Sequence, residues 1–198
     1  MKNQTKESIL NGLAEILSLA KSEEDVHSFL KQHDVILKCL GYDWVWSKLP
    51  LGSDYITDFV LARTFSEGLH ILALELENPN YGGVFTKQGR PNHTLATAIS
   101  QVADWSIWIE SNKPLFLKTI RKNIQRDYPI DWSRTPKHRL YKLSQIKLGV
   151  VVGRREPVES ELTAELKLKY QGISPNISIM SYDRLIENFE RQSFLWFR

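Results

Sequence analysis

Two neighbouring apolar segments limit most strongly what this chain can fold into. Residues 55–63 (YITDFVLAR) and 69–77 (LHILALELE) are rich in the β-branched, aromatic and aliphatic residues that are typical of strands. A Glu-Gly pair between them supplies a reversal of the chain. The pattern therefore predicts two adjacent strands that form a hairpin.

Acidic residues occur inside both of these apolar segments. Glu75 and Glu77 are two residues apart, so they project from the same face of a strand, and a hairpin can bring Asp58 beside Glu75. Gathered carboxylates repel one another unless a cation lies between them, and Mg²⁺ prefers such oxygen ligands. A metal held there would suit phosphodiester hydrolysis. The alternative is a set of solvent-facing acids on an edge hairpin.

The rest of the chain predicts helices around this hairpin. Apolar residues recur at helical spacing before residue 20, and a helix signal begins at Ser22. Further strands are expected at 44–46, 147–152 and 177–180, and further helices at 95–110, 159–170 and 182–191. This order predicts an α/β (α+β) fold with a mixed central β-sheet flanked by helices. In a single compact domain of 198 residues, we expect helices within 1–40 to pack on a core formed by 41–198.

Positive charge is concentrated in one part of the chain. The net charge is +3, yet the stretch from Lys113 to Lys147 holds ten Lys or Arg and only two acids. Phe116, Tyr128, Trp132 and Tyr141 lie in the same stretch. Basic and aromatic residues together favour contact with a nucleic acid, and a solvated basic face is the alternative.

Several classes of protein are not indicated. No apolar run approaches the ~18 residues of a membrane span, so we expect no membrane association. The first residues lack a secretion-signal pattern, and Cys39 has no second cysteine to pair with, so we expect a cytoplasmic protein. No small organic cofactor is expected.

The acids and their spacing resemble the D…(D/E)-x-K signature of the PD-(D/E)XK nucleases. Several phrases are similar to one branch, the Shedu-type anti-phage nucleases, in an order that covers most of residues 23–190. These phrases are DFVLAR (58–63), ALELENP (73–79), VFTKQGRPN (84–92), AISQVADW (98–105), VVVGRR (150–155) and SYDRLIENF (181–189).

The resemblance implies a restriction-endonuclease-like core and a DNA endonuclease that uses Mg²⁺ or Mn²⁺. Asp58 and Glu75 would be metal ligands, and Glu24 (or Glu23) would be an additional acid from a helix. Gln101 matches a helix glutamine that could orient a water or a phosphate oxygen. A buried amide satisfied by the backbone is the other interpretation of Gln101.

One residue departs from the signature, because Glu77 stands where the family has lysine. That lysine would stabilise charge developing on phosphate, which a glutamate cannot do. Three interpretations follow: Lys87 reaches back into the site, Glu77 binds a second metal, or the site is catalytically silent. We favour Lys87, and a solvated loop or simple phosphate contact is the alternative for it.

Basic residues beyond the acids are candidates for contact with nucleic acid: Arg90, Lys118, Arg121, Lys122, Arg154 and Arg155. Arg154 and Arg155 could clamp phosphate, or they could pair with Glu156 or Glu159. Two further hypotheses remain open, a catalytically silent module that binds nucleic acid or a partner protein, and a nuclease acting on RNA. Cutting both strands of a duplex would favour a homo-oligomer.

Overall fold

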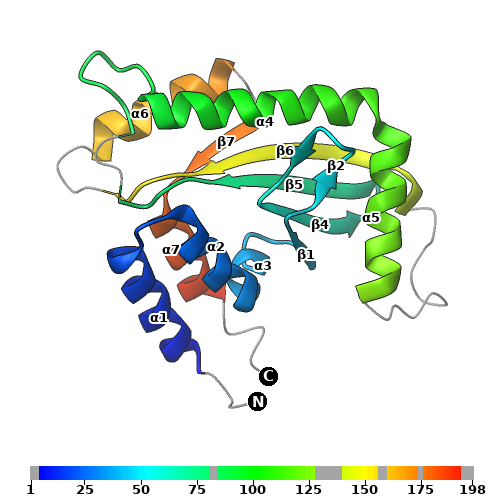
Figure 1. The fold of residues 1–198 in the computed structure, drawn as a ribbon, viewed down its shortest axis with the longest axis horizontal. Coiled ribbons are helices and arrows are strands. Elements are labelled where there is room, and N and C mark those ends of the chain that lie inside the picture. The colour runs from blue at the N-terminus through cyan, green and yellow to red at the C-terminus, as the bar shows by residue number, and fades with distance from the viewer. Residues whose placement is uncertain (1–4, 81–83, 128–139, 156–159, 174–175, 193–198) are drawn as a thin grey trace.

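The structure is a computed structural model that describes residues 5–80, 84–127, 140–155, 160–173 and 176–192 (Figure 1). Its elements, in chain order, are α1 (Lys6–Leu19), α2 (Glu23–Gln32), α3 (Val35–Lys38), β1 (Trp44–Ser47), β2 (Pro50–Leu51), β3 (Tyr55–Ile56), β4 (Phe59–Phe65), β5 (Gly68–Leu76), α4 (His93–Ser111), α5 (Lys113–Asp127), β6 (Leu143–Val151), α6 (Ser160–Ile173), β7 (Ile177–Met180) and α7 (Tyr182–Gln192).

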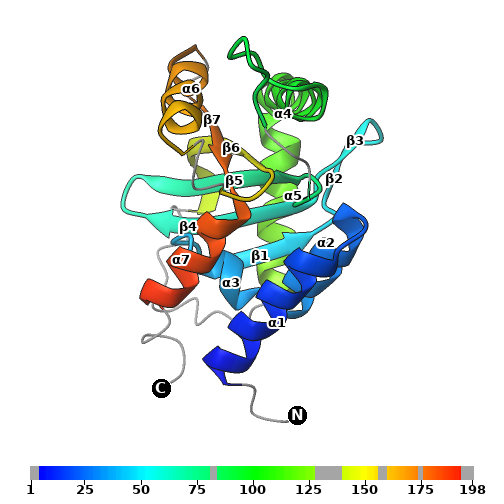
Figure 2. The ribbon, with the colours of Figure 1, turned by 90° about the vertical axis from the view of Figure 1, so that its left-hand side faces the viewer.

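The centre of the fold is a five-stranded sheet in the order β1-β4-β5-β6-β7. The first three strands in this order are antiparallel, whereas β6 runs parallel to β5 and β7 runs parallel to β6. Helices α4 and α6 lie on one side of the sheet, and α1, α2, α3 and α7 lie on the other (Figures 1 and 2). The expected mixed central sheet flanked by helices is confirmed.

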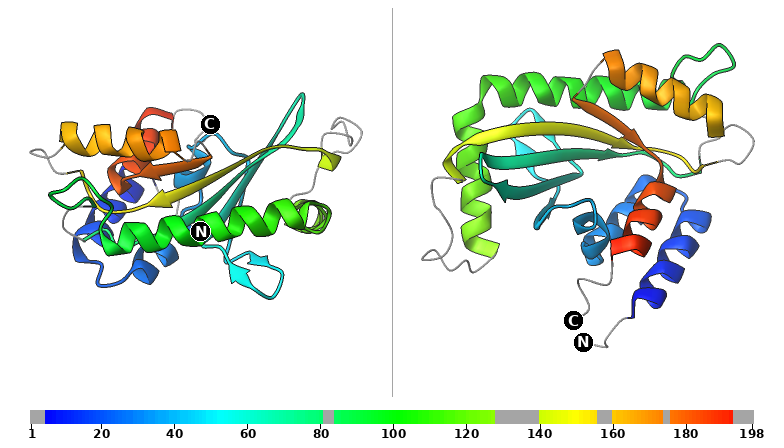
Figure 3. Two further views of the ribbon diagram at one scale, coloured as in Figure 1. Left: turned by 90° about the horizontal axis from the view of Figure 1, so that it is seen from above. Right: turned by 180° about the vertical axis from the view of Figure 1, so that it is seen from behind.

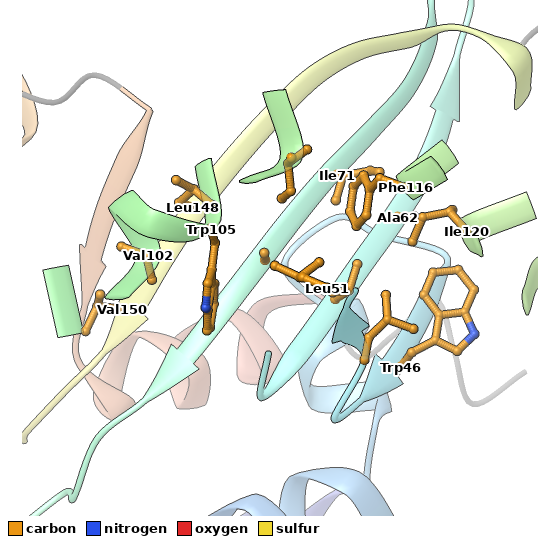
Figure 4. Close-up of a cluster of buried hydrophobic side chains, with 14 of the residues drawn as sticks. Trp46, Leu51, Ala62, Ile71, Val102, Trp105, Phe116, Ile120, Leu148 and Val150 are labelled. Atoms are coloured by element: carbon orange, nitrogen blue, oxygen red, sulfur yellow. The ribbon is translucent and has the colours of Figure 1, made fainter. Parts of the chain in front are cut away.

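One face of the sheet packs against α4 and α5. Trp105 and Val102 of α4 pack over Leu148 and Val150 of β6 (Figure 4). Phe116 of α5 covers the end of the sheet near Ile71. These α4 and α5 side chains are almost fully buried. Each such side chain contributes roughly 1.5–3 kcal/mol relative to exposure, which fixes α4 across the strands.

The opposite face packs against the N-terminal helices and α7. Phe59 and Leu61 of β4 project to this face, whereas Val60 and Ala62 project to the face covered by α4. Leu13 and Leu17 of α1, Leu30 of α2 and Phe189 of α7 complete this second buried cluster. The strand alternation therefore decides which helix each residue meets.

The predicted strand at 55–63 is in fact two strands, and this part of the prediction was wrong. Tyr55 and Ile56 pair with the short strand β2, and the sheet strand β4 begins only at Phe59. Thr57 makes the break, because its main-chain N–H and its hydroxyl both donate to the main-chain oxygen of Leu49, at 3.0 and 3.1 Å. Asp58 therefore stands at the entrance of β4.

Part of the basic stretch forms a helix that sequence patterning did not predict. Helix α5 begins with Pro114 in its first turn, where proline is tolerated, and buries Phe116, Ile120 and Ile124 at helical spacing. It turns away from α4 and runs along the end of the sheet (Figure 3). Tyr128 and Trp132 lie outside the described residues. No helix in the described part of the chain is long and apolar enough to cross a bilayer.

Candidate active site

The β4–β5 hairpin holds Asp58 and Glu75 on the same face of the sheet. Phe59 pairs with Leu74 in the antiparallel ladder, and continuing this register sets Asp58 opposite Glu75. Both side chains are buried, with exposures of 5% and 8%. One carboxylate oxygen of Asp58, Oδ2, accepts a hydrogen bond of 2.7 Å from the main-chain N–H of Leu76.

Crowding of these acids disturbs their protonation. Burial, with the charges of Asp58, Glu77 and Glu23, raises the pKa of Glu75 from 4.5 to about 9. Burial, with the charges of Glu23 and Asp58, raises the pKa of Glu77 to about 7. Burial and mutual repulsion therefore disfavour full ionisation of the cluster, and a cation bound between the carboxylates would favour it.

Lys48 is the cation that lies against this cluster. Its Nζ donates to Oδ1 of Asp58 at 2.7 Å and lies 3.8 Å from Oε2 of Glu24. Its main-chain N–H donates to the main-chain oxygen of Asp58 at 2.8 Å. Lys48 has a φ of 50°, the one positive φ among the described non-glycine residues. Such a conformation costs of order 1–3 kcal/mol and persists where surrounding contacts hold it.

The structure changes which lysine is associated with the acids. Burial alone would lower the pKa of Lys48, but its hydrogen bond to Asp58 and the nearby carboxylates outweigh this effect and raise it. Lys87 is exposed in the loop before α4 and makes no ion pair with these acids within the described residues. The position expected for Lys87 is thus occupied by Lys48, which comes from the connection between β1 and β2.

The start of α2 brings two more acids to the cluster. The side chains of Asn78 and Asn80, which follow β5, donate to the main-chain oxygens of Lys21 and Ala20, at 3.4 and 2.8 Å. These bonds hold α2 beside the end of β5. Burial and the charge of Asp58 raise the pKa of Glu23, whereas Glu24 is 63% exposed and pairs with Lys48.

A cleft of about 470 Å³ opens beside these acids. Glu23 and Glu77 line one side, and Thr94 and Thr97 from the first turns of α4 line the other. The amino end of a helix attracts anions through its main-chain N–H groups and dipole. Acids that can hold a cation therefore face a helix end that can hold an anion.

Gln101 lies on α4, one turn beyond Thr97, and is half-buried. Thr97 lines the cleft, and residues four apart share a helix face, so Gln101 points to the same side of α4. No hydrogen bond joins its side chain to the acids among the residues that the structure describes. Its expected role stays a prediction.

Two buried residues that the sequence did not single out contact the main chain of the acidic residues. The hydroxyl of Tyr182, at the start of α7, donates to the main-chain oxygen of Glu77 at 2.6 Å. The ring of His27 of α2 packs against that of Phe59 at a tilt of 31°, and its Nε2 lies 3.4 Å from the main-chain oxygen of Asp58. The signal available for both was an aromatic or imidazole ring on the apolar side of a predicted helix, which is also typical of an ordinary core residue.

Most of the predicted nucleic-acid contacts lie away from the acids. Arg154 pairs with Asp183 at 2.9 Å and Arg155 with Glu187, so both guanidinium groups are bound to α7. Their expected alternative partners, Glu156 and Glu159, lie outside the described residues. The other predicted contacts lie on α5 or in the loop before α4: Arg121, stacked over Tyr141 at 4.2 Å, and the exposed Lys118, Lys122 and Arg90.

The donor set at the site suits a hard divalent cation. Asp58 and Glu75 supply carboxylate oxygens, and Mg²⁺ is commonly held by one or two carboxylates, its own waters and substrate phosphates. No group of three or more His, Cys, Asp or Glu residues is arranged to hold a metal within the described ranges. Burial and the neighbouring carboxylates raise the pKa of Glu75, so a cation bound between these acids would favour its ionised form.

Comparison with known proteins identifies the family. No curated protein matches this chain. A solved structure of the restriction endonuclease FokI bound to DNA is similar at 15% identity and a TM-score of 0.46, covering 96% of this chain but 30% of that one. The sequence model described as "Shedu protein SduA, C-terminal" matches residues 20–186. This match spans most of the chain and confirms the expected resemblance, so the chain belongs to the family of the C-terminal region of Shedu protein SduA.

Proposed function

We propose that this chain is a divalent-metal-dependent nuclease that hydrolyses phosphodiester bonds of DNA. One observation carries the proposal: the ammonium of Lys48 lies 2.7 Å from Oδ1 of Asp58, whose Oδ2 accepts a hydrogen bond from the main-chain N–H of Leu76, the residue after Glu75. Two acids and one lysine are the chemical groups that the nuclease signature requires. Here the lysine comes from the connection between β1 and β2, and in this proposal it takes the role of the lysine that is absent at position 77.

In this proposal Asp58 and Glu75 hold the metal, with Glu23 as the additional acid. A divalent ion supplies Lewis-acid chemistry at such a site, polarising the phosphate and lowering the pKa of a water. Glu75 is buried, so ionising it without a nearby cation is unfavourable. The proposed metal is Mg²⁺ or Mn²⁺.

The residues of the chain orient and neutralise the phosphate. Lys48 is held by Asp58 and is 44% exposed, so two of its three N–H donors can face a substrate. Charge that develops on phosphate during hydrolysis is stabilised by donors already in position. Thr94 and Thr97, at the amino end of α4, offer hydroxyls on the opposite wall of the cleft.

The test is cleavage of supercoiled plasmid and of a labelled RNA by purified protein, with Mg²⁺ or Mn²⁺. Glu75→Gln and Lys48→Met should each lower the cleavage rate by about 10²–10³-fold, the usual cost of removing one charge-stabilising group. Asp104→Asn and Lys169→Met change exposed residues on α4 and α6 and serve as matched controls. Full activity in Glu75→Gln would sink the proposal, and cleavage of RNA alone would redirect it.

A second candidate is a silent module that binds nucleic acid or a partner protein. Glu77, in place of the signature lysine, is the observation that favours it. Binding of DNA with no cleavage under any divalent ion would support the module. The nuclease proposal includes a role in anti-phage defence and a homo-oligomeric state. Loss of phage protection in cells that carry Glu75→Gln would support the defence role. Light scattering of the purified protein measures the oligomeric state.

A further inference from the structure

A second hollow, the β1–α5 groove, is lined by Lys48, the lysine that contacts Asp58. It has a volume of about 550 Å³ and is bordered by α2, by the connection from β1 to β2, and by α5. Binding sites for small molecules and single units of larger ligands have volumes of about 300–1,000 Å³. The β1–α5 groove is therefore large enough for one nucleotide unit.

Cations from three separate elements line the β1–α5 groove. They are Lys31 from α2, Lys48 from the β1–β2 connection and Arg126 from α5. Asp34 is the one acid on the wall, and it already pairs with Lys38 at 2.8 Å. Arg126 is bound by Asp127 at 2.5 and 2.6 Å, and Lys48 by Asp58 at 2.7 Å. Lys31 and the N–H groups of Arg126 that do not contact Asp127 are therefore the donors that remain to attract a polyanion.

Asn123 is an unpaired amide in the same wall. It is buried to 7% exposure on α5 and lines the β1–α5 groove. No hydrogen bond of its side chain is made to any other described residue. The amide atoms of Asn123 are not among the enclosed polar atoms without a partner in the described residues, so they are open to the groove and can donate to a ligand that enters it.

Lys48 and helix α2 link the groove to the candidate active site. Lys48 lines the groove while its Nζ contacts Asp58 and lies near Glu24, which lines the acid cleft. Helix α2 runs from that cleft to Lys31 in the groove, and the rise from Glu24 to Lys31 is roughly 10 Å. Successive phosphates of one DNA strand are separated by more than the axial rise of about 3.4 Å per nucleotide, so this distance spans no more than about two nucleotides.

We propose that the β1–α5 groove binds a backbone phosphate of the substrate strand within about two nucleotides of the reacting bond. This inference rests on the proposed nuclease function. Lys31 and Arg126 neutralise the phosphate, and the amide of Asn123 donates to its oxygen. The exposed Lys118 and Lys122 precede Arg126 at intervals of four residues on α5, and they extend this cationic row along the strand.

The test is binding of a fluorescent DNA duplex in EDTA, where no cleavage takes place, across a range of salt concentrations. The double variant Lys31→Glu/Arg126→Glu should bind roughly tenfold more weakly for each lost contact at 0.1 M salt, and the slope of log K against log salt should fall by about two. Lys169→Glu/Arg191→Glu changes two exposed basic residues of α6 and α7 and should bind as the wild type does.

Asn123→Leu separates a binding role from a structural one. The two side chains have similar volumes, so the variant should unfold at the wild-type temperature or higher but bind the duplex more weakly. The proposal that the groove binds a phosphate would be overturned by a double variant with unchanged affinity and salt slope. A wild type that binds no DNA would overturn it as well. Plasmid cleavage by the wild type in Mg²⁺ is scored separately, so failure of the nuclease proposal is distinguishable from failure of the groove.

Discussion

Tyr182 donates a hydrogen bond of 2.6 Å to the main-chain oxygen of Glu77, which joins the first residue of α7 to the residue that follows β5. Tyr182 is fully buried, and burial together with the charges of the nearby acids raises its pKa well above the usual value. The hydroxyl therefore remains a donor throughout the physiological range. Helix α7 thus helps to fix the end of the strand that carries Glu75.

Removing this bond should loosen the acid cluster. Tyr182→Phe keeps the ring but leaves the Glu77 carbonyl without this donor, which should cost about 1 kcal/mol of the free energy of unfolding. For a chain of this size the melting temperature should fall by about 2–4 °C. Tyr170→Phe is the control, because Tyr170 stacks on Phe85 and has no hydroxyl bond within the described residues. Equal melting temperatures for Tyr182→Phe and the wild type would contradict this account.

Substitutions of Lys48 and Lys87 distinguish which of the two lysines acts at the site. The structure favours Lys48, whereas the sequence alone favoured Lys87. Lys48→Met should abolish most cleavage, whereas Lys87→Met should change it little, because only Lys48 contacts Asp58. Lys48→Arg retains the positive charge and should recover part of the rate. Single-turnover cleavage with bound DNA measures all three variants. The reverse order of effects, with Lys87→Met the slower enzyme, would restore Lys87 as the essential lysine.

The raised pKa of Glu75 predicts how stability depends on pH in the absence of metal. Burial raises this pKa from 4.5 to about 9. Between these two pH values Glu75 therefore keeps its proton in the folded state and releases it in the unfolded state. The free energy of unfolding should therefore fall as the pH rises from about 5 to 9. Glu75→Gln should flatten the fall and melt at a higher temperature than the wild type at pH 8–9 in EDTA. A wild type that grows more stable over this range would show the opposite sign.

Two glycines predict opposite effects of the same substitution. Gly68 has a φ of 142°, and an added Cβ would lie 2.5 Å from the main-chain oxygen of Lys142, so Gly68→Ala should destabilise the hairpin by at least about 1 kcal/mol. Gly172 in α6 has open space around its Cα, and Gly172→Ala should stabilise the helix by about 0.5–1 kcal/mol. Urea unfolding of both variants measures the two signs. A stabilised Gly68→Ala would show that the hairpin relaxes.

The hairpin was predictable because its signals are local. Alternating side-chain direction follows from residue order, so the shared face of Asp58 and Glu75 could be inferred without coordinates. The break at Thr57 was not predictable, because it depends on Leu49 accepting two hydrogen bonds across the β2–β3 turn. A continuous run of strand-forming residues conceals that interruption.

Lys48 could not be found from the sequence for a related reason. Its approach to Asp58 depends on the pairing of β1 with β4, in which Ser47 meets Phe59, and on a backbone conformation that lysine rarely adopts. Neither leaves a pattern in residue order. Helix α5 was missed because its polar face masks a narrow buried stripe, and the pairing of Arg154 with Asp183 depends on a helix 29 residues further along the chain.

The place of Lys48 in the sequence, ahead of both acids, has a consequence for recognising distant relatives of this chain. Lys48, Asp58 and Glu75 all lie within β1, β4, β5 and their connections, a single antiparallel meander. A search pattern that demands lysine two positions after the second acid would reject this chain. If Lys48 has the proposed role, a lysine ten positions ahead of the first acid, with a short two-stranded hairpin between them, is a more suitable query for chains that carry glutamate at the usual lysine position.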